Sequence, residues 1–106
     1  MLDAIPFLGY CWLVDIYDVE ISKKAVKDLS KVPRPILDKL QSWIEAIELE
    51  GLREVRKLAS FHDEPLKGKR KGQRSIRLNR SYRAIYTIQN EKIKFVFIEE
   101  INKHDY

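Results

Sequence analysis

The sequence predicts a single α+β domain in which helices cover one face of a mainly antiparallel sheet. The first observation is the order of segments: one extended segment, two amphipathic helical segments, then three successive extended segments. The second is length, because 106 residues suffice for one hydrophobic core but not for two. Helices and strands that are segregated along the chain in this way are typical of α+β folds. We therefore expect residues 1–106 to form one domain.

The first strand and the first helix are predicted next to each other. Residues 12–21 mix aromatic and β-branched side chains and end at Ser22, a favourable helix N-cap. Apolar residues then recur at helical spacing until Pro33 and Pro35 force a corner. The apolar stripe of this short helix consists of Ala25, Val26, Leu29 and Val32.

A second, stronger helix and a three-stranded meander complete the expected fold. The helix is predicted from Ile36, and Gly51 should end or kink it. Leu37, Leu40, Trp43, Ile44 and Ile47 form its stripe, and Leu52, Val55 and Leu58 indicate one more helical stretch. Strands are predicted over residues 74–79, 82–89 and 93–101, with turns at 79–81 and 90–91. The helical hairpin should cover one sheet face and leave the other to solvent or a ligand.

Composition limits the class of protein. The single Cys11 excludes an internal disulfide and a cysteine-based zinc site, so we expect a cytoplasmic protein. Residues 1–14 are apolar, but no Lys or Arg precedes them, unlike a signal peptide, and a membrane span needs about 20 residues. They are an added strand, a surface arm or the product of a misassigned start.

Positive charge is concentrated in one stretch of the chain. A net charge of +4 favours a polyanionic partner, and no acidic residue lies between Lys67 and Arg83. Arg77 and Arg83 fall inside predicted strands, which direct a guanidinium more firmly than a flexible tail does. The alternative is a solvated loop that only maintains solubility. The basic residues are Lys67, Lys69, Arg70, Lys71, Arg74, Arg77, Arg80 and Arg83.

Residues 102–106, which follow the last predicted strand, bring together groups that could act on RNA. Cleaving RNA through its own 2′-hydroxyl needs a base, cationic donors for the phosphorane and an acid for the departing 5′-oxygen. His104 is a candidate for proton transfer, and Tyr106 for donating a proton or stacking on a base. His62 is a further candidate, although a lone histidine is more often structural. No metal, nucleotide or acyl-enzyme motif is present, so no cofactor is expected.

Several pieces of the basic stretch together resemble one toxin family. Leu66-Lys67-Gly68, Ser75-Ile76-Arg77 and Tyr82-Arg83 resemble the HigB branch of the RelE/ParE toxins, and residues 22–29 resemble their first helix. The resemblance covers about residues 18–106. It implies a sheet similar to that of microbial ribonucleases, with RNA across its exposed side. It also implies cleavage of mRNA in the ribosomal A site, beside the 16S rRNA, and a cognate antitoxin with acidic or helical segments as partner.

The resemblance also implies roles for single residues. Arg83 matches the arginine that stabilises the scissile phosphate, with Arg77 as its companion, and Lys67 and Lys69 match positions that engage phosphate. Further expected RNA contacts are Arg70, Lys71, Arg74 and His62. The chain departs from the family at two places: it ends His104-Asp105-Tyr106 where the family order is Asp-Tyr-His, and Glu64 replaces a histidine.

Two other functions fit the same residues. A ParE-like inhibitor of DNA gyrase would share the fold without any need for an acid–base pair, since fold does not fix function. A non-catalytic module that binds RNA or the ribosome would use the same arginines only to grip phosphates. Cleavage of message distinguishes the ribonuclease from both.

Overall fold

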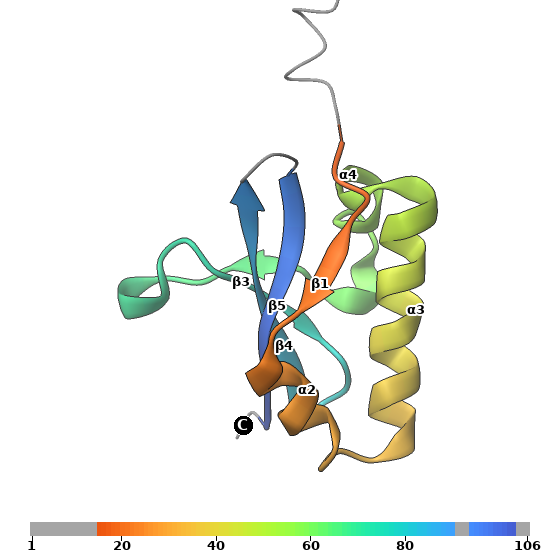
Figure 1. Cartoon of the computed structure of the whole chain (residues 1–106), viewed down its shortest axis with the longest axis vertical. Helices are drawn as coiled ribbons and strands as arrows, with labels where there is room; N and C mark the ends of the chain where they lie inside the picture. Colours follow the sequence, from red (N-terminus) through yellow and green to blue (C-terminus); the bar gives the residue numbers. More distant parts are fainter. Residues whose placement is uncertain (1–14, 91–93, 104–106) are drawn as a thin grey trace, which may run out of the picture.

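A five-stranded sheet with helices along one side organises the protein (Figure 1). The computed structural model describes residues 15–90 and 94–103. The sheet order is β1-β5-β4-β3-β2; β1 is parallel to β5, and the other neighbours are antiparallel. The strands are β1 (Val19–Ile21), β2 (Glu64–Pro65), β3 (Arg74–Arg77), β4 (Tyr82–Asn90) and β5 (Lys94–Lys103). This arrangement confirms the α+β fold and the three-stranded meander.

The helices lie in the predicted segments, although the first ends at Leu29, before Val32, and the last ends at Val55, before Leu58. In α2 (Lys23–Leu29), the Ser22 hydroxyl accepts a hydrogen bond from the backbone N–H of Ala25, as expected of an N-cap. Helix α3 (Arg34–Glu50) starts two residues earlier than Ile36, because proline is tolerated in the first turn, where no intrahelical N–H is needed. Gly51 ends α3 at φ 90°, and the short α4 (Leu52–Val55) follows. None of the helices within residues 15–90 and 94–103 is long and apolar enough to cross a membrane.

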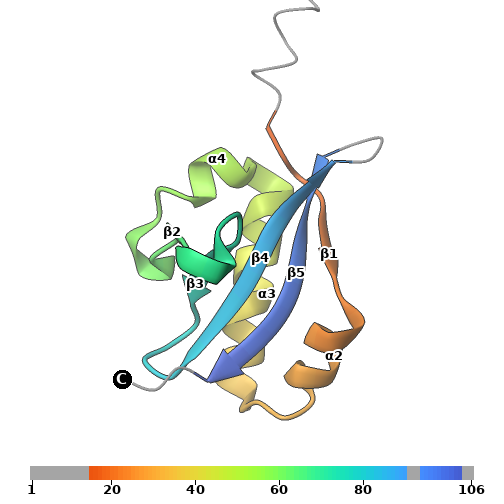
Figure 2. The same ribbon diagram turned by 90° about the vertical axis from the view of Figure 1, so that its left-hand side faces the viewer.

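The hydrophobic core lies between α3 and the sheet. Helix α3 buries Ile36, Leu40, Trp43 and Ile47, which lie three or four residues apart and so form one stripe. Trp43 packs against Tyr86 of β4, with ring centroids 5.1 Å apart. The inner residues of the sheet are Ile76, Ala84, Tyr86, Val96, Ile98 and Ile101. Figure 2 shows α3 behind the strands, with the opposite sheet face toward the viewer.

Two elements differ from the prediction. The first strand is confined to Val19–Ile21, because residues just before it are held by α4 instead: the Asp15 carboxylate accepts from the Arg53 N–H at 3.0 Å, and Leu52 N–H donates to Ile16 O. The predicted part at 12–14 lies outside the described residues. The second difference is β2, which pairs with β3 inside the segment predicted as a polar loop. The loop also contains two 3₁₀ turns, η1 (Ala59–Phe61) and η2 (Gly68–Arg70).

Candidate nucleic-acid interface

The sheet face away from α3 carries the arginines that the sequence singles out. Ile76 and Ala84 point into the core, so by strand alternation their neighbours Arg77 and Arg83 point to the opposite face. Arg77 on β3 pairs with Arg83 on β4, and Arg83 pairs on its other side with Asn102 on β5. Arg83 Nε donates to Asn102 Oδ1 at 3.2 Å. An amide orients the guanidinium without neutralising its charge.

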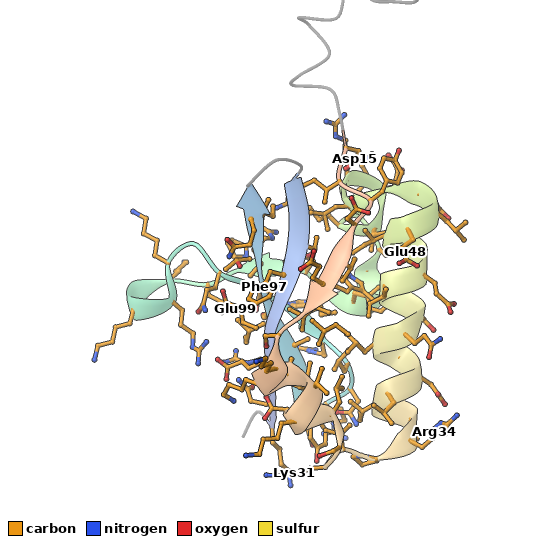
Figure 3. The ribbon with its side chains drawn as sticks, in the orientation of Figure 1. Asp15, Lys31, Arg34, Glu48, Phe97 and Glu99 are labelled. Atoms are coloured by element: carbon orange, nitrogen blue, oxygen red, sulfur yellow. The ribbon has the colours of Figure 1, made fainter. Side chains whose placement is uncertain are left out.

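An irregularity in β5 places two acidic residues on this same face. The pairing of β4 with β5 shifts between Ile85 and Tyr86, so that Ile85 lies opposite Glu100 and Tyr86 lies opposite Ile98. Glu99 is the extra residue of a β-bulge, a feature that re-aims side chains and often lies beside functional sites. Figure 3 shows Glu99 on the side of β5 away from α3.

Glu100 connects the basic loop to the arginine pair. Its Oε2 accepts from Arg70 Nη1 at 3.1 Å, and its Oε1 accepts from Asn102 Nδ2 at 3.3 Å. Lys24 Nζ of α2 lies 3.9 Å from Oε1. Burial alone would raise the pKa of Glu100, but the hydrogen bonds from Asn102 and Arg70 and the charges of Arg70 and Lys24 outweigh it, so the pKa is lowered. Glu100 is therefore ionised at neutral pH.

Glu99 is held by neutral donors. Gln73 Nε2, at the base of the loop, donates to Glu99 Oε1 at 2.6 Å, and Thr87 Oγ1 on β4 donates to Glu99 Oε2 at 3.0 Å. Gln89 Nε2 donates in turn to Thr87 Oγ1 at 2.9 Å. The loop is thus attached to both bulge residues of β5.

Arg74 lies on the other side of the sheet, in a buried cluster with Asp63 and Tyr86. Arg74 Nε donates to Asp63 Oδ1 at 2.7 Å, and the Tyr86 hydroxyl donates to Asp63 Oδ2 at 2.6 Å. The Asp63 side chain has no exposed area and that of Arg74 is 24% exposed. Burial, followed by the Asp63 charge and hydrogen bond, raises the pKa of Tyr86 against an opposing effect of Arg56. The sequence predicts Arg74 as an RNA contact, but its guanidinium pairs with Asp63 and stabilises the fold.

The three loop lysines remain at the surface. Lys67, Lys69 and Lys71 are exposed around η2, on the loop that projects from the uncovered face (Figures 1 and 2). Gly68 and Gly72 adopt φ 67° and 97°, a region that glycine enters without strain, and a Cβ built on either would have nothing within 4 Å. Open backbone and exposed ammonium groups are what a phosphate chain needs.

Of the three predicted acid–base residues, the structure describes only His62. His62 ends η1, and its Nε2 lies 3.4 Å from Oε2 of Glu64, with both side chains about half exposed. His104 and Tyr106 lie outside the described residues, and β5 ends at Lys103, the residue before His104. Among residues 15–90 and 94–103, no three His, Cys, Asp or Glu side chains could together hold a metal ion.

Sequence reasoning missed most of the polar residues that organise this face, namely Gln73, Thr87, Glu99 and Glu100. One signal was present in the sequence. Two adjacent glutamates inside an apolar strand break the two-residue alternation, which is a signature of a bulge.

Comparison with known proteins places this fold among bacterial toxins. The sequence matches no family model and no curated protein. The YoeB/ParE toxin from Agrobacterium tumefaciens matches with a TM-score of 0.64 at 15% identity over 83% of this chain and 99% of that one. The E. coli DinJ-YafQ toxin-antitoxin complex gives 0.64 at 20% identity over 86% and 94%. The toxin-antitoxin complex RelBE2 from Mycobacterium tuberculosis gives 0.53 at 24% identity over 86% and 100%.

The chain therefore has the fold of the RelE/ParE toxins over most of its length, which confirms the resemblance found in the sequence. The alignments cover 94% to 100% of these three similar chains. Assignment to the HigB branch stays a prediction.

Proposed function

We propose that this protein is the toxin of a type II toxin–antitoxin pair and an endoribonuclease that cuts ribosome-bound mRNA. The observation that carries the proposal is the pairing of Arg77, Arg83 and Asn102 across three strands of the uncovered sheet face. Two arginines at directly opposite positions on neighbouring strands bring two cationic groups to one place on this face, where both could contact the same phosphate. The exposed loop lysines extend the positive surface toward neighbouring phosphates.

The reaction that fits is transesterification within the RNA. The 2′-oxygen attacks the adjacent phosphorus, the bond from phosphorus to the 5′-oxygen breaks, and a 2′,3′-cyclic phosphate and a 5′-hydroxyl result. The 2′-hydroxyl proton goes to a base, and an acid returns a proton to the 5′-oxygen. Arg83, with Arg77 beside it, would stabilise the charge that builds up on the phosphorane. No metal ion is required by this scheme.

The base and the acid are proposed near the end of β5. His104 and Tyr106 come two and four residues after Asn102 in the sequence, and Asn102 lies opposite Arg83 in the sheet. His62 is the alternative donor or acceptor of a proton. Glu100 is a poor choice for a base, because its pKa is lowered and both of its oxygens already accept hydrogen bonds.

The proposed partners are a cognate antitoxin, mRNA and the ribosome with its 16S rRNA, in the cytoplasm. The DinJ-YafQ and RelBE2 structures are toxin-antitoxin complexes, which supports an antitoxin partner for a chain of the same fold. An antitoxin that neutralises this chain should place acidic groups over the loop lysines and Arg83.

The test is induction in bacteria of the wild-type protein, Arg83→Ala and a control, Arg34→Ala. Arg34 is an exposed arginine of α3 that pairs with Asp38 at 3.2 Å, on the far side of the molecule. New 5′ ends are mapped on translated and untranslated copies of one message. We expect cuts confined to translated message, present with Arg34→Ala and absent with Arg83→Ala.

Other outcomes identify the other functions. Cuts that persist in soluble Arg83→Ala would remove Arg83 from the site. Growth arrest without cuts, together with loss of DNA supercoiling by gyrase, would instead establish a ParE-like inhibitor. Neither arrest nor cuts would leave a binding module.

A further inference from the structure

Glu99 and Glu100 lie on the face that is proposed to bind RNA, where negative charge would repel phosphate. Glu100 is 19% exposed, and its two oxygens are divided between different partners. One oxygen accepts from Arg70 of the loop, and the other accepts from Asn102 of its own strand. A base for the 2′-hydroxyl needs a free lone pair aimed at that proton, so the geometry of Glu100 suits a different role.

The hydrogen bonds form a continuous chain from the loop to the arginine pair. Because a carboxylate only accepts, Asn102 must turn its NH₂ toward Glu100, and this turns its Oδ1 toward Arg83. The orientation of Asn102 thus depends on Glu100, and the direction of the Arg83 guanidinium depends on Asn102. At its other end, Arg70 is also fixed by Gln73, whose Oε1 accepts from the same Nη1 at 3.1 Å.

We propose that Glu100 and Asn102 are positioning residues that hold Arg83 at the scissile phosphate. Through Arg70, they also link the orientation of Arg83 to the position of the basic loop against β5. This inference rests on the proposed function of Arg83. The bulge at Glu99 is what brings it about, because it turns Glu100 to the uncovered face opposite Ile85 while Ile98 and Ile101 stay in the core. Glu100 acts on Arg83 and Arg70, and does not touch the RNA.

The experiment compares Glu100→Gln, Asn102→Ala and the double variant with a control, Glu54→Gln. Glu54 is an exposed glutamate of α4 that pairs with Lys57 at 3.1 Å. Single-turnover cleavage of message on ribosomes gives the rate, and an uncleavable RNA with 2′-O-methyl groups gives the affinity. We expect each single variant to cleave roughly 10- to 100-fold more slowly, because the guanidinium is no longer aimed. Affinity in Glu100→Gln should be unchanged or higher, because a negative charge has left the RNA face.

Two results separate positioning from a general structural role. If both residues act through one chain of bonds, the double variant should be no slower than the slower single variant, whereas independent effects would multiply. A structural role would lower rate and affinity together. Unchanged rates in both single variants, or multiplied losses in the double variant, would overturn the inference.

A direct observation of Arg83 keeps the test independent of cleavage. The side-chain Nε–Hε resonance of Arg83 is assigned by its absence in Arg83→Lys. It should shift in Glu100→Gln through the hydrogen bond of Glu100 with Asn102, and stay in place in Glu54→Gln. If the wild-type protein does not cleave message, the proposed function is refuted. The resonance would still show whether Glu100 orients Arg83 through Asn102. An unshifted resonance would refute the chain alone.

Discussion

The buried contact between Asp63, Arg74 and Tyr86 yields the sharpest prediction about stability, through Asp63→Asn. The substitution keeps the shape of the side chain but removes a charge that accepts from Arg74 at 2.7 Å and from the Tyr86 hydroxyl at 2.6 Å. Removing one partner of a buried ion pair costs about 3–5 kcal/mol. Because 24% of the Arg74 side chain reaches water and asparagine keeps one acceptor, we expect a loss of about 2–4 kcal/mol.

Urea unfolding followed by circular dichroism measures this loss. Domains of this size have about 5–15 kcal/mol of stability in total, so the midpoint should fall clearly. Glu54→Gln, which removes an exposed pair with Lys57, should stay within about 0.5 kcal/mol of the wild type. RNA affinity of Arg74→Gln, measured where the variant is folded, should match the wild type. A loss below about 1 kcal/mol for Asp63→Asn, or weaker RNA binding by Arg74→Gln, would refute the assignment of Arg74 to the fold.

Three further variants test the effects of pH and backbone conformation. Because the pKa of Tyr86 is raised, its contribution to stability is complete below pH about 10 and is lost as pH rises further. The free energy of unfolding of Tyr86→Phe should therefore fall less steeply above pH about 10 than that of the wild type. The lowered pKa of Glu100 contributes stability that is present above pH about 4.3 and is lost as pH falls, so Glu100→Gln should flatten the acid side of the stability profile. Gly72→Ala should lower the free energy of unfolding by about 1–2 kcal/mol through backbone strain alone, since φ is 97° and the space around the residue is open. Thermal melting measures this loss. No change in melting temperature would show that the loop adopts another conformation.

The fold was predictable where local chemistry decides the structure. Ser22 is followed by a helical stripe, Gly51 interrupts one, and the strands of the meander alternate between apolar and polar residues. The turn at Asn79 also followed from residue type, because its Oδ1 accepts from the N–H groups of Ser81 and Tyr82. The two-residue strand β2 was not predictable, because so short a segment is defined by its partner β3 and not by its own sequence.

The site was predictable only in part, because a run of basic residues in the sequence does not show which of them form ion pairs within the fold. Arg70, Arg74 and Arg83 belong to one run of basic residues, yet Arg74 pairs with Asp63 and Arg70 pairs with Glu100, which is 30 residues away. The strand periodicity placed Arg83 correctly. The bulge that redirects Glu100 shifts the alternation within β5, so a strict two-residue period assigns one of the two glutamates to the wrong face.

The parallel pairing of β1 with β5 bears on how the chain is made. Val19 lies beside Val96, so β1 has no neighbour in the sheet until the ribosome has synthesised residues about 77 positions further on. β4 likewise lacks one of its two partners, and Arg83 lacks Asn102, before β5 is made. A nascent chain that does not yet contain β5 therefore has an incomplete sheet, and its Arg83 lacks the hydrogen bond to Asn102. The face that is proposed to bind RNA is therefore completed only by the last strand of the sheet to be synthesised.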